Sequence, residues 1–144
     1  MSEFQIQLQE KGRCRIRHAK TDAEIVTDLP PEYGGQGRSF SSTDLVSAAL
    51  GSCILSTIDT IFEREGHDPK KIAVKVTKRL SDRPKMIRSI DVEISYPDAL
   101  SDLFLKKAGR AMNLCPVKRS LNESIEIRTR FTTRSAGYEN AEKS

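Results

Sequence analysis

Three cysteines are the side chains of this 144-residue chain that are best suited to chemistry: Cys14, Cys53 and Cys115. A thiolate is a nucleophile, and two thiols can be oxidised to a disulfide that a third thiol then reduces. Three scattered cysteines are too few for a structural disulfide framework. Each cysteine is therefore either a reactive thiol or a small buried side chain.

Cys115 has the sequence context that most favours a thiolate. It precedes Pro116, and proline favours the first position of a helix, so the sulfur should face unpaired backbone N–H groups. Lys118 and Arg119 follow within one turn. These groups favour the charged form, so we expect a lowered pKa for Cys115. An incidental helix cap is the competing interpretation.

The other two cysteines have plainer contexts. Cys53 lies inside an apolar segment, where a free cysteine is typically a small core residue. Cys14 shares one face of an expected strand with Ile16 and His18, which indicates a structural role despite the arginines around it.

Several other chemistries have no support in the sequence. The cysteines and histidines form no CxxC or HxxxH pattern for a metal, no GxSxG motif is present, and Gly34–Gly37 lacks the features of a phosphate loop. The net charge is +4 and aromatic residues make up only 6%, so we expect no nucleic-acid partner. The basic residues between 70 and 88 are interpreted as one solvated face of a hairpin, with Asp91 and Glu93 as ion-pair partners on the next strand.

Hydrophobic periodicity predicts six strands and three helices. The strands are expected at 4–9, 13–18, 23–29, 71–80, 86–96 and 124–134, and the helices at 42–66, 99–114 and 116–122. Strands and helices come in clusters, which predicts an α+β fold with antiparallel pairing. The length predicts one domain over 1–144, with a frayed polar tail at 135–144.

The helix expected at 42–66 is the clearest element. Ser41 and Asp44 have the spacing of a capping box, and Gly66 is a plausible stop. The segment between them is apolar or small on nearly every face, so we expect a central helix buried all round, by a sheet and by a second element, with a partner subunit as one candidate. No apolar stretch approaches the ~20 residues of a membrane span, and no signal peptide is recognisable. We therefore expect a cytoplasmic protein without a membrane partner.

The sequence TDLVSAALGSC on this helix, followed about sixty residues later by NLCPV, resembles the OsmC/Ohr family of peroxiredoxin-like thiol peroxidases. The resemblance covers nearly the whole chain, and the order of elements agrees with it. It implies an OsmC-like fold with antiparallel sheets around a long central helix. It also implies an intertwined homodimer with two active sites at the subunit interface.

The resemblance further implies reduction of organic hydroperoxides or hydrogen peroxide. Cys53 takes the role of the peroxidatic cysteine and Cys115 that of the resolving cysteine. An arginine activates the thiolate in this family, and Arg38 is favoured here over Arg13. No bound cofactor is implied, only an external thiol or dithiol reductant.

The chain departs from the family pattern at the start of the helix. Thr43 stands where characterised peroxidases have a glutamate that holds the arginine, and the preceding proline is missing. Asp44 is the nearest acid and is taken as its replacement. This departure motivates an alternative hypothesis, a small-ligand-binding protein of the same fold with little or no peroxidase activity.

Overall fold

The structure is a computed structural model, and it describes residues 1–133. The predicted frayed tail at 135–144 therefore lies outside the described residues. The chain forms two compact units, Met1–Val46 and Ser47–Ser144. Each is described by itself.

The first unit contains a three-stranded antiparallel sheet. Its strands are β1 (Phe4–Glu10), β2 (Arg13–His18) and β3 (Glu24–Asp28), paired in that order. A short 3-10 helix, η1 (Pro31–Tyr33), interrupts the loop that follows. The three predicted strands are thus confirmed.

The apolar face of this sheet is exposed in the single chain. The register places Ile6 opposite Ile16, and Ile16 opposite Ile25, so the three isoleucines share one face. Phe4, Ile6 and Leu8 on β1 are 55%, 63% and 70% exposed. The expectation that this strand is half-buried is wrong for one chain alone, because nothing in the first unit covers its apolar side.

Helix α1 (Ser42–Arg64) begins and ends as its sequence predicts. Asp44 Oδ2 accepts a hydrogen bond from the Ser41 amide at 2.8 Å, and Ser41 Oγ accepts one from the Asp44 amide at 3.1 Å. These reciprocal bonds form the capping box. At the other end, Gly66 has a φ of 79°, and the His67 amide donates to the Phe62 carbonyl. This left-handed turn after the helix is the conformation that glycine adopts most readily.

From Ser47 onward, α1 is buried along one face and not all round. The buried positions recur every three or four residues: Ser47, Leu50, Gly51, Ile54, Ile58 and Phe62. Gly51 allows a close approach to the sheet, since a Cβ there would lie 2.5 Å from Val76 Cγ2. The prediction of complete burial is therefore wrong within one chain, where neighbouring elements cover a single face.

Helix α1 also corrects the expectation that no segment approaches membrane length. It has 23 residues, and an 18-residue stretch of it has a mean hydropathy of 1.7. By length and composition alone it could cross a bilayer. The core helix of a soluble protein meets the same criterion, and the buried face of α1 packs within such a core.

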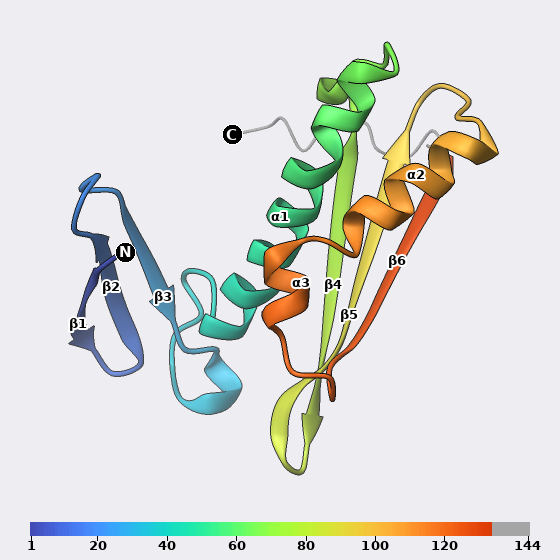
Figure 1. Cartoon of the computed structure of the whole chain (residues 1–144). Helices are drawn as coiled ribbons and strands as arrows, with labels where there is room; N and C mark the ends of the chain where they lie inside the picture. Colours follow the sequence, from blue (N-terminus) through green and yellow to red (C-terminus); the bar gives the residue numbers. More distant parts are fainter. Residues whose placement is uncertain (134–144) are drawn as a thin grey trace. The chain divides into compact units, whose positions relative to one another are not determined.

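The second unit is a three-stranded sheet with helices on one face (Figure 1). Strands β4 (Ala73–Asp82) and β5 (Lys85–Tyr96) form an antiparallel hairpin, preceded by the 3-10 helix η2 (Pro69–Lys71). Strand β6 (Glu126–Thr133) pairs with β5 in parallel. The α+β class is confirmed, but this pair departs from the expected antiparallel arrangement. A parallel partner needs a crossover connection, which α2 (Asp102–Met112) and α3 (Pro116–Ser120) supply.

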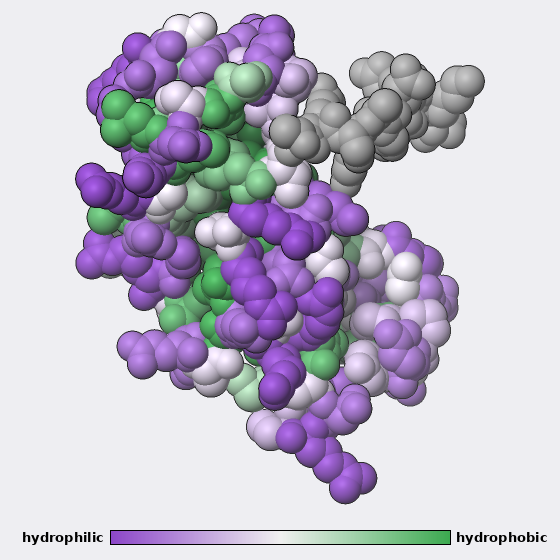
Figure 2. Space-filling model, turned by 90° about the vertical axis from the view of Figure 1, so that its right-hand side faces the viewer, coloured by the Kyte–Doolittle hydropathy of each residue, from purple (hydrophilic) through white to green (hydrophobic). Residues whose placement is uncertain are grey.

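The core of the second unit lies between this sheet and the helices. Its fully or almost fully buried apolar side chains come from α1, β5, α2 and the start of α3: Leu50, Ile54, Ile58, Phe62, Ile87, Ile90, Val92, Ile94, Tyr96, Phe104, Ala108, Met112 and Cys115. The visible face in Figure 2 is mainly hydrophilic, with smaller hydrophobic areas between the charged groups. Cys115 is one of these core residues, and its burial determines the chemistry of its thiol.

Candidate active site

Two of the three cysteines lie side by side in the second unit. The Sγ atoms of Cys53 and Cys115 are 2.6 Å apart, and the Cys115 thiol donates to the Cys53 sulfur. Both are free thiols in the structure. A disulfide bond is about 2.05 Å long, so only a small movement separates the two sulfurs from bonding distance.

The elements around the cysteines explain this proximity. Cys53 lies near the middle of α1 and packs against the core from its half-buried side. Helix α2 ends at Met112, and the amide of Cys115 donates to the Met112 carbonyl at 3.3 Å. Pro116 then starts α3, and the Arg119 amide donates to the Cys115 carbonyl. This tight turn between α2 and α3 brings Cys115 to the side of α1.

The two thiols differ in how far the fold shields them from solvent. Cys115 is completely buried, whereas Cys53 is half-buried. Burial raises the pKa of the Cys115 thiol, and its hydrogen bond to Cys53 raises the pKa further. The backbone amides of Lys118 and Val117 act in the opposite direction but do not prevail. The expectation of a lowered pKa at Cys115 is therefore wrong, because desolvation outweighs the helix N-terminus.

Both arginines singled out in the sequence lie in the first unit and bind one carboxylate, that of Asp28 at the end of β3. Arg38 donates to Asp28 Oδ2 from Nε at 2.8 Å and from its backbone amide at 3.2 Å. Arg13 Nη1 donates to the same oxygen at 3.3 Å. Arg38 also donates from Nη2 to Glu10 Oε1 at 2.7 Å. Arg38 is thus fixed by two acids, and sequence reasoning found neither of them.

The Asp28 carboxylate is buried, and one of its oxygens has no partner. Its side chain has no exposed surface, and the hydrogen bonds from Arg38 hold the pKa of this carboxyl below its ordinary range, against the effect of burial. All the hydrogen bonds above reach Oδ2, while Oδ1 is buried without a hydrogen-bond partner. Alternation along β3 gave no signal for this carboxylate, because Thr27 and Asp28 are both buried at the end of the strand although they point to opposite faces.

The remaining candidates have structural partners. Asp44, predicted as a site residue, serves in the capping box of α1 with Ser41. Thr43 lies beside it, with its hydroxyl 3.1 Å from that of Ser41. Cys14 lies on β2 opposite Leu8 and Thr27 and is half-buried. Within residues 1–133, no three potential metal-ligating side chains lie together.

The comparisons with known proteins identify the family and the fold. A family model described as OsmC-like protein matches residues 35–130. The protein YmaD of Bacillus subtilis (strain 168) is 21% identical over 117 residues, which are 76% of this chain and 78% of YmaD.

Two solved structures are similar over most of their lengths. A Psychrobacter arcticus 273-4 protein, described as an osmotic stress induced and detoxification response protein, is 26% identical with a TM-score of 0.85, over 92% of this chain and 96% of its own. An organic hydroperoxide resistance protein, OsmC, from Legionella pneumophila has a TM-score of 0.75 at 11% identity, over the same shares. The second likeness concerns the fold alone.

Proposed function

Because the chain belongs to the OsmC-like protein family, we propose that it is a cytoplasmic thiol peroxidase that reduces organic hydroperoxides or hydrogen peroxide. Relatives of similar fold carry names that refer to hydroperoxide resistance and to a detoxification response. The proposed enzyme serves the same kind of stress protection. It uses no bound cofactor and consumes an external thiol or dithiol reductant.

One observation carries the proposal: the contact between the Cys53 and Cys115 sulfurs. Cys53 is the accessible partner and accepts the hydrogen bond, whereas Cys115 is buried and donates it. A nucleophile must meet a substrate from solvent, and a resolving thiol need only meet the first sulfur. The geometry therefore supports Cys53 as the peroxidatic and Cys115 as the resolving cysteine.

The proposed cycle has three steps. The Cys53 thiolate attacks one oxygen of the O–O bond, that bond breaks, and a proton from solvent turns the leaving group into an alcohol or water. Cys53 is then a sulfenic acid. Cys115 attacks its sulfur, water leaves, and the Cys53–Cys115 disulfide forms. Two thiols of the reductant exchange with this disulfide and restore both cysteines.

Arg38 is proposed as the residue that stabilises the Cys53 thiolate, with Asp28 and Glu10 holding its guanidinium. A positive charge near a thiol favours the thiolate. Arg13 makes a single, longer hydrogen bond to Asp28, so its guanidinium is held less firmly than that of Arg38. We therefore expect Arg38→Gln to slow sulfenic acid formation more than Arg13→Gln does. Stopped-flow oxidation of the two variants under equal peroxide would measure this, and equal rates would remove Arg38 from the role.

A homodimer is proposed as the active form. The apolar face of β1, with Phe4, Ile6 and Leu8 mostly exposed, is typical of an interface. In the homodimer, the partner subunit covers this face, as in the intertwined dimer that the family resemblance implies.

The experiment is to treat the reduced protein with one equivalent of cumene hydroperoxide and to map all cysteines by mass spectrometry without reductant. The expected product is a Cys53–Cys115 disulfide with Cys14 left free, formed at the same rate in the Cys14→Ser variant. Slow or indiscriminate oxidation of the three cysteines would contradict the proposal. It would favour the alternative, a ligand-binding protein of this family without peroxidase activity.

A further inference from the structure

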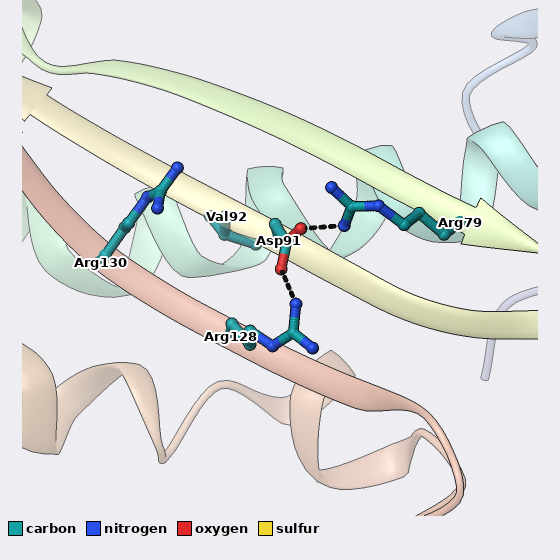
Figure 3. Close-up of a pocket in the computed structure, with 5 residues that line it drawn as sticks. All are labelled: Arg79, Asp91, Val92, Arg128 and Arg130. Carbon is teal, nitrogen blue, oxygen red and sulfur yellow. Dashed lines mark hydrogen bonds and ion pairs between the residues drawn. The ribbon is translucent and has the colours of Figure 1, made fainter.

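The outer face of the β4–β5–β6 sheet holds a pocket that the proposed peroxidase reaction does not use. It has a volume of about 260 Å³ and is lined by Arg79, Asp91, Val92, Arg128 and Arg130 (Figure 3). Side chains alternate along β5, and Val92 is buried in the core while Asp91 lies on the other face. The charged pocket therefore opens on the side of the sheet away from Cys53 and Cys115.

Strand register explains why the arginines converge. Asp91 on β5 is directly opposite Arg128 on β6, and Glu93 is opposite Arg130. Arg79 comes from β4 on the other side of β5. Figure 3 shows Arg79 and Arg128 reaching Asp91 from opposite sides. Arg79 donates a hydrogen bond to Asp91 Oδ2, and Arg128 donates one to Asp91 Oδ1 at 3.3 Å.

Asp91 acts as an internal anion that holds two guanidinium groups in place. Its side chain is only 17% exposed, and the Arg79 hydrogen bond lowers the pKa of this carboxyl. Glu126 binds Arg128, and Glu93 binds Arg130, but neither acid lines the pocket. These contacts orient the arginines and leave the pocket itself lined by three guanidinium groups and one carboxylate.

The lining selects a class of ligand. A guanidinium has five N–H donors in a planar fork. All three nitrogens of Arg128 donate to Asp91 or Glu126, whereas Arg79 and Arg130 each use one nitrogen, so the donors left for a ligand lie mainly on Arg79 and Arg130. The fork fits phosphate oxygens and binds them more strongly than neutral donors do. The volume is below the roughly 300–1,000 Å³ of sites for drug-sized ligands, so the ligand is small.

We propose that this pocket binds a small phosphate-bearing anion of about the size of inorganic pyrophosphate. The competing explanation is a surface of ion pairs in which Asp91, Glu93 and Glu126 only neutralise the arginines. That explanation predicts no saturable binding of an anion. The two are therefore separated by a binding measurement.

The experiment titrates pyrophosphate into the wild-type protein and into variants by calorimetry, at constant pH and ionic strength. We expect one site per chain in the wild type. Arg128→Gln should weaken binding about tenfold or more, the value of a charged hydrogen bond. Arg130→Gln serves as the second weakening variant if Arg128→Gln unfolds, as judged by circular dichroism.

The matched control is Arg88→Gln, which removes the same charge from an exposed position on β5 outside the pocket. It should leave the affinity unchanged. The proposal is overturned by the absence of saturable binding or by an equal loss of affinity in Arg88→Gln. An oligonucleotide that binds more tightly than pyrophosphate, with a steep salt dependence, would assign the face to nucleic acid instead and would also overturn it.

Discussion

Cys115 donates its thiol hydrogen to the sulfur of Cys53 across 2.6 Å, although the two residues are 62 positions apart in the chain. The donor is fully buried and the acceptor is half-buried. The same pair therefore contains a protected thiol and an accessible one, which is the asymmetry that a two-step thiol oxidation requires.

Replacing Cys115 by serine should trap the first intermediate of the proposed reaction. Without the resolving thiol, Cys53 should remain a sulfenic acid after one equivalent of hydroperoxide, and turnover with a dithiol reductant should be lost or strongly reduced. Dimedone labelling followed by mass spectrometry measures this. Cys53→Ser should abolish turnover, and retained activity in that variant would refute the assignment of the peroxidatic cysteine.

Asp28→Asn should lower the stability of the fold at neutral pH and should make that stability change less as the pH falls. The pKa of Asp28 is lowered in the fold by its hydrogen bonds to Arg38. A carboxyl of this kind stabilises the protein above its unfolded pKa of about 3.9, and the stabilisation is lost as pH falls through the lower folded value. Melting temperatures at pH 7 and at about pH 3 should therefore differ less in the variant than in the wild type.

The exposed Asp98, which pairs with Lys71 at 3.3 Å, supplies the control for this measurement. Asp98→Asn should have little effect at either pH, because exposed ion pairs contribute little. If Asp28→Asn behaved in the same way, the bonds from Arg13 and Arg38 would not stabilise the first unit.

Gly51→Ala should loosen the packing of α1 on β4. The new Cβ would lie 2.5 Å from Val76 Cγ2, and a β-branched side chain cannot easily turn away. We expect a loss of about 1–3 kcal/mol in the free energy of unfolding, measured by urea denaturation. Val76→Ala in the same chain should recover part of it.

Gly109 is the matched control, since it lies within α2 and a Cβ there would meet nothing within 4 Å. Gly109→Ala should stabilise the chain by about 0.5–1 kcal/mol, because alanine favours a helix interior over glycine. Equal effects of the two substitutions would contradict close packing at Gly51.

Ile6→Glu should disrupt the proposed homodimer. Ile6 is 63% exposed in the single chain and shares an apolar face with Ile16, so a charge there would be buried in any interface that covers this face. Sedimentation velocity should show a dimer for the wild type and a monomer for the variant. Gln5→Glu, on the opposite face of the same strand, should remain dimeric; a monomeric wild type would refute the dimer.

The order of elements could be predicted from the sequence because it depends on local patterns. Alternation identified all six strands, and the Ser41–Asp44 spacing located the start of α1. Gly66 located its end in the same way. The motifs around Cys53 and Cys115 also indicated the family, because each motif is a short run of consecutive residues in the sequence.

Several properties depend on contacts that no local pattern contains. The pKa of Cys115 is raised because the fold buries it, whereas its neighbours in the chain would lower it. Strand β6 pairs in parallel because α2 and α3 carry the chain back across the sheet.

The partners of charged side chains also required the tertiary structure. Asp28 was not singled out in the sequence, yet it binds Arg13, fifteen positions before it, and Arg38, ten positions after it. The three arginines around Asp91 come from strands that meet only in the folded sheet. Sequence patterns determine which face of an element is apolar, because that depends on residues two to four positions apart. Which charges meet, and which thiol is shielded from water, depends on how distant segments pack.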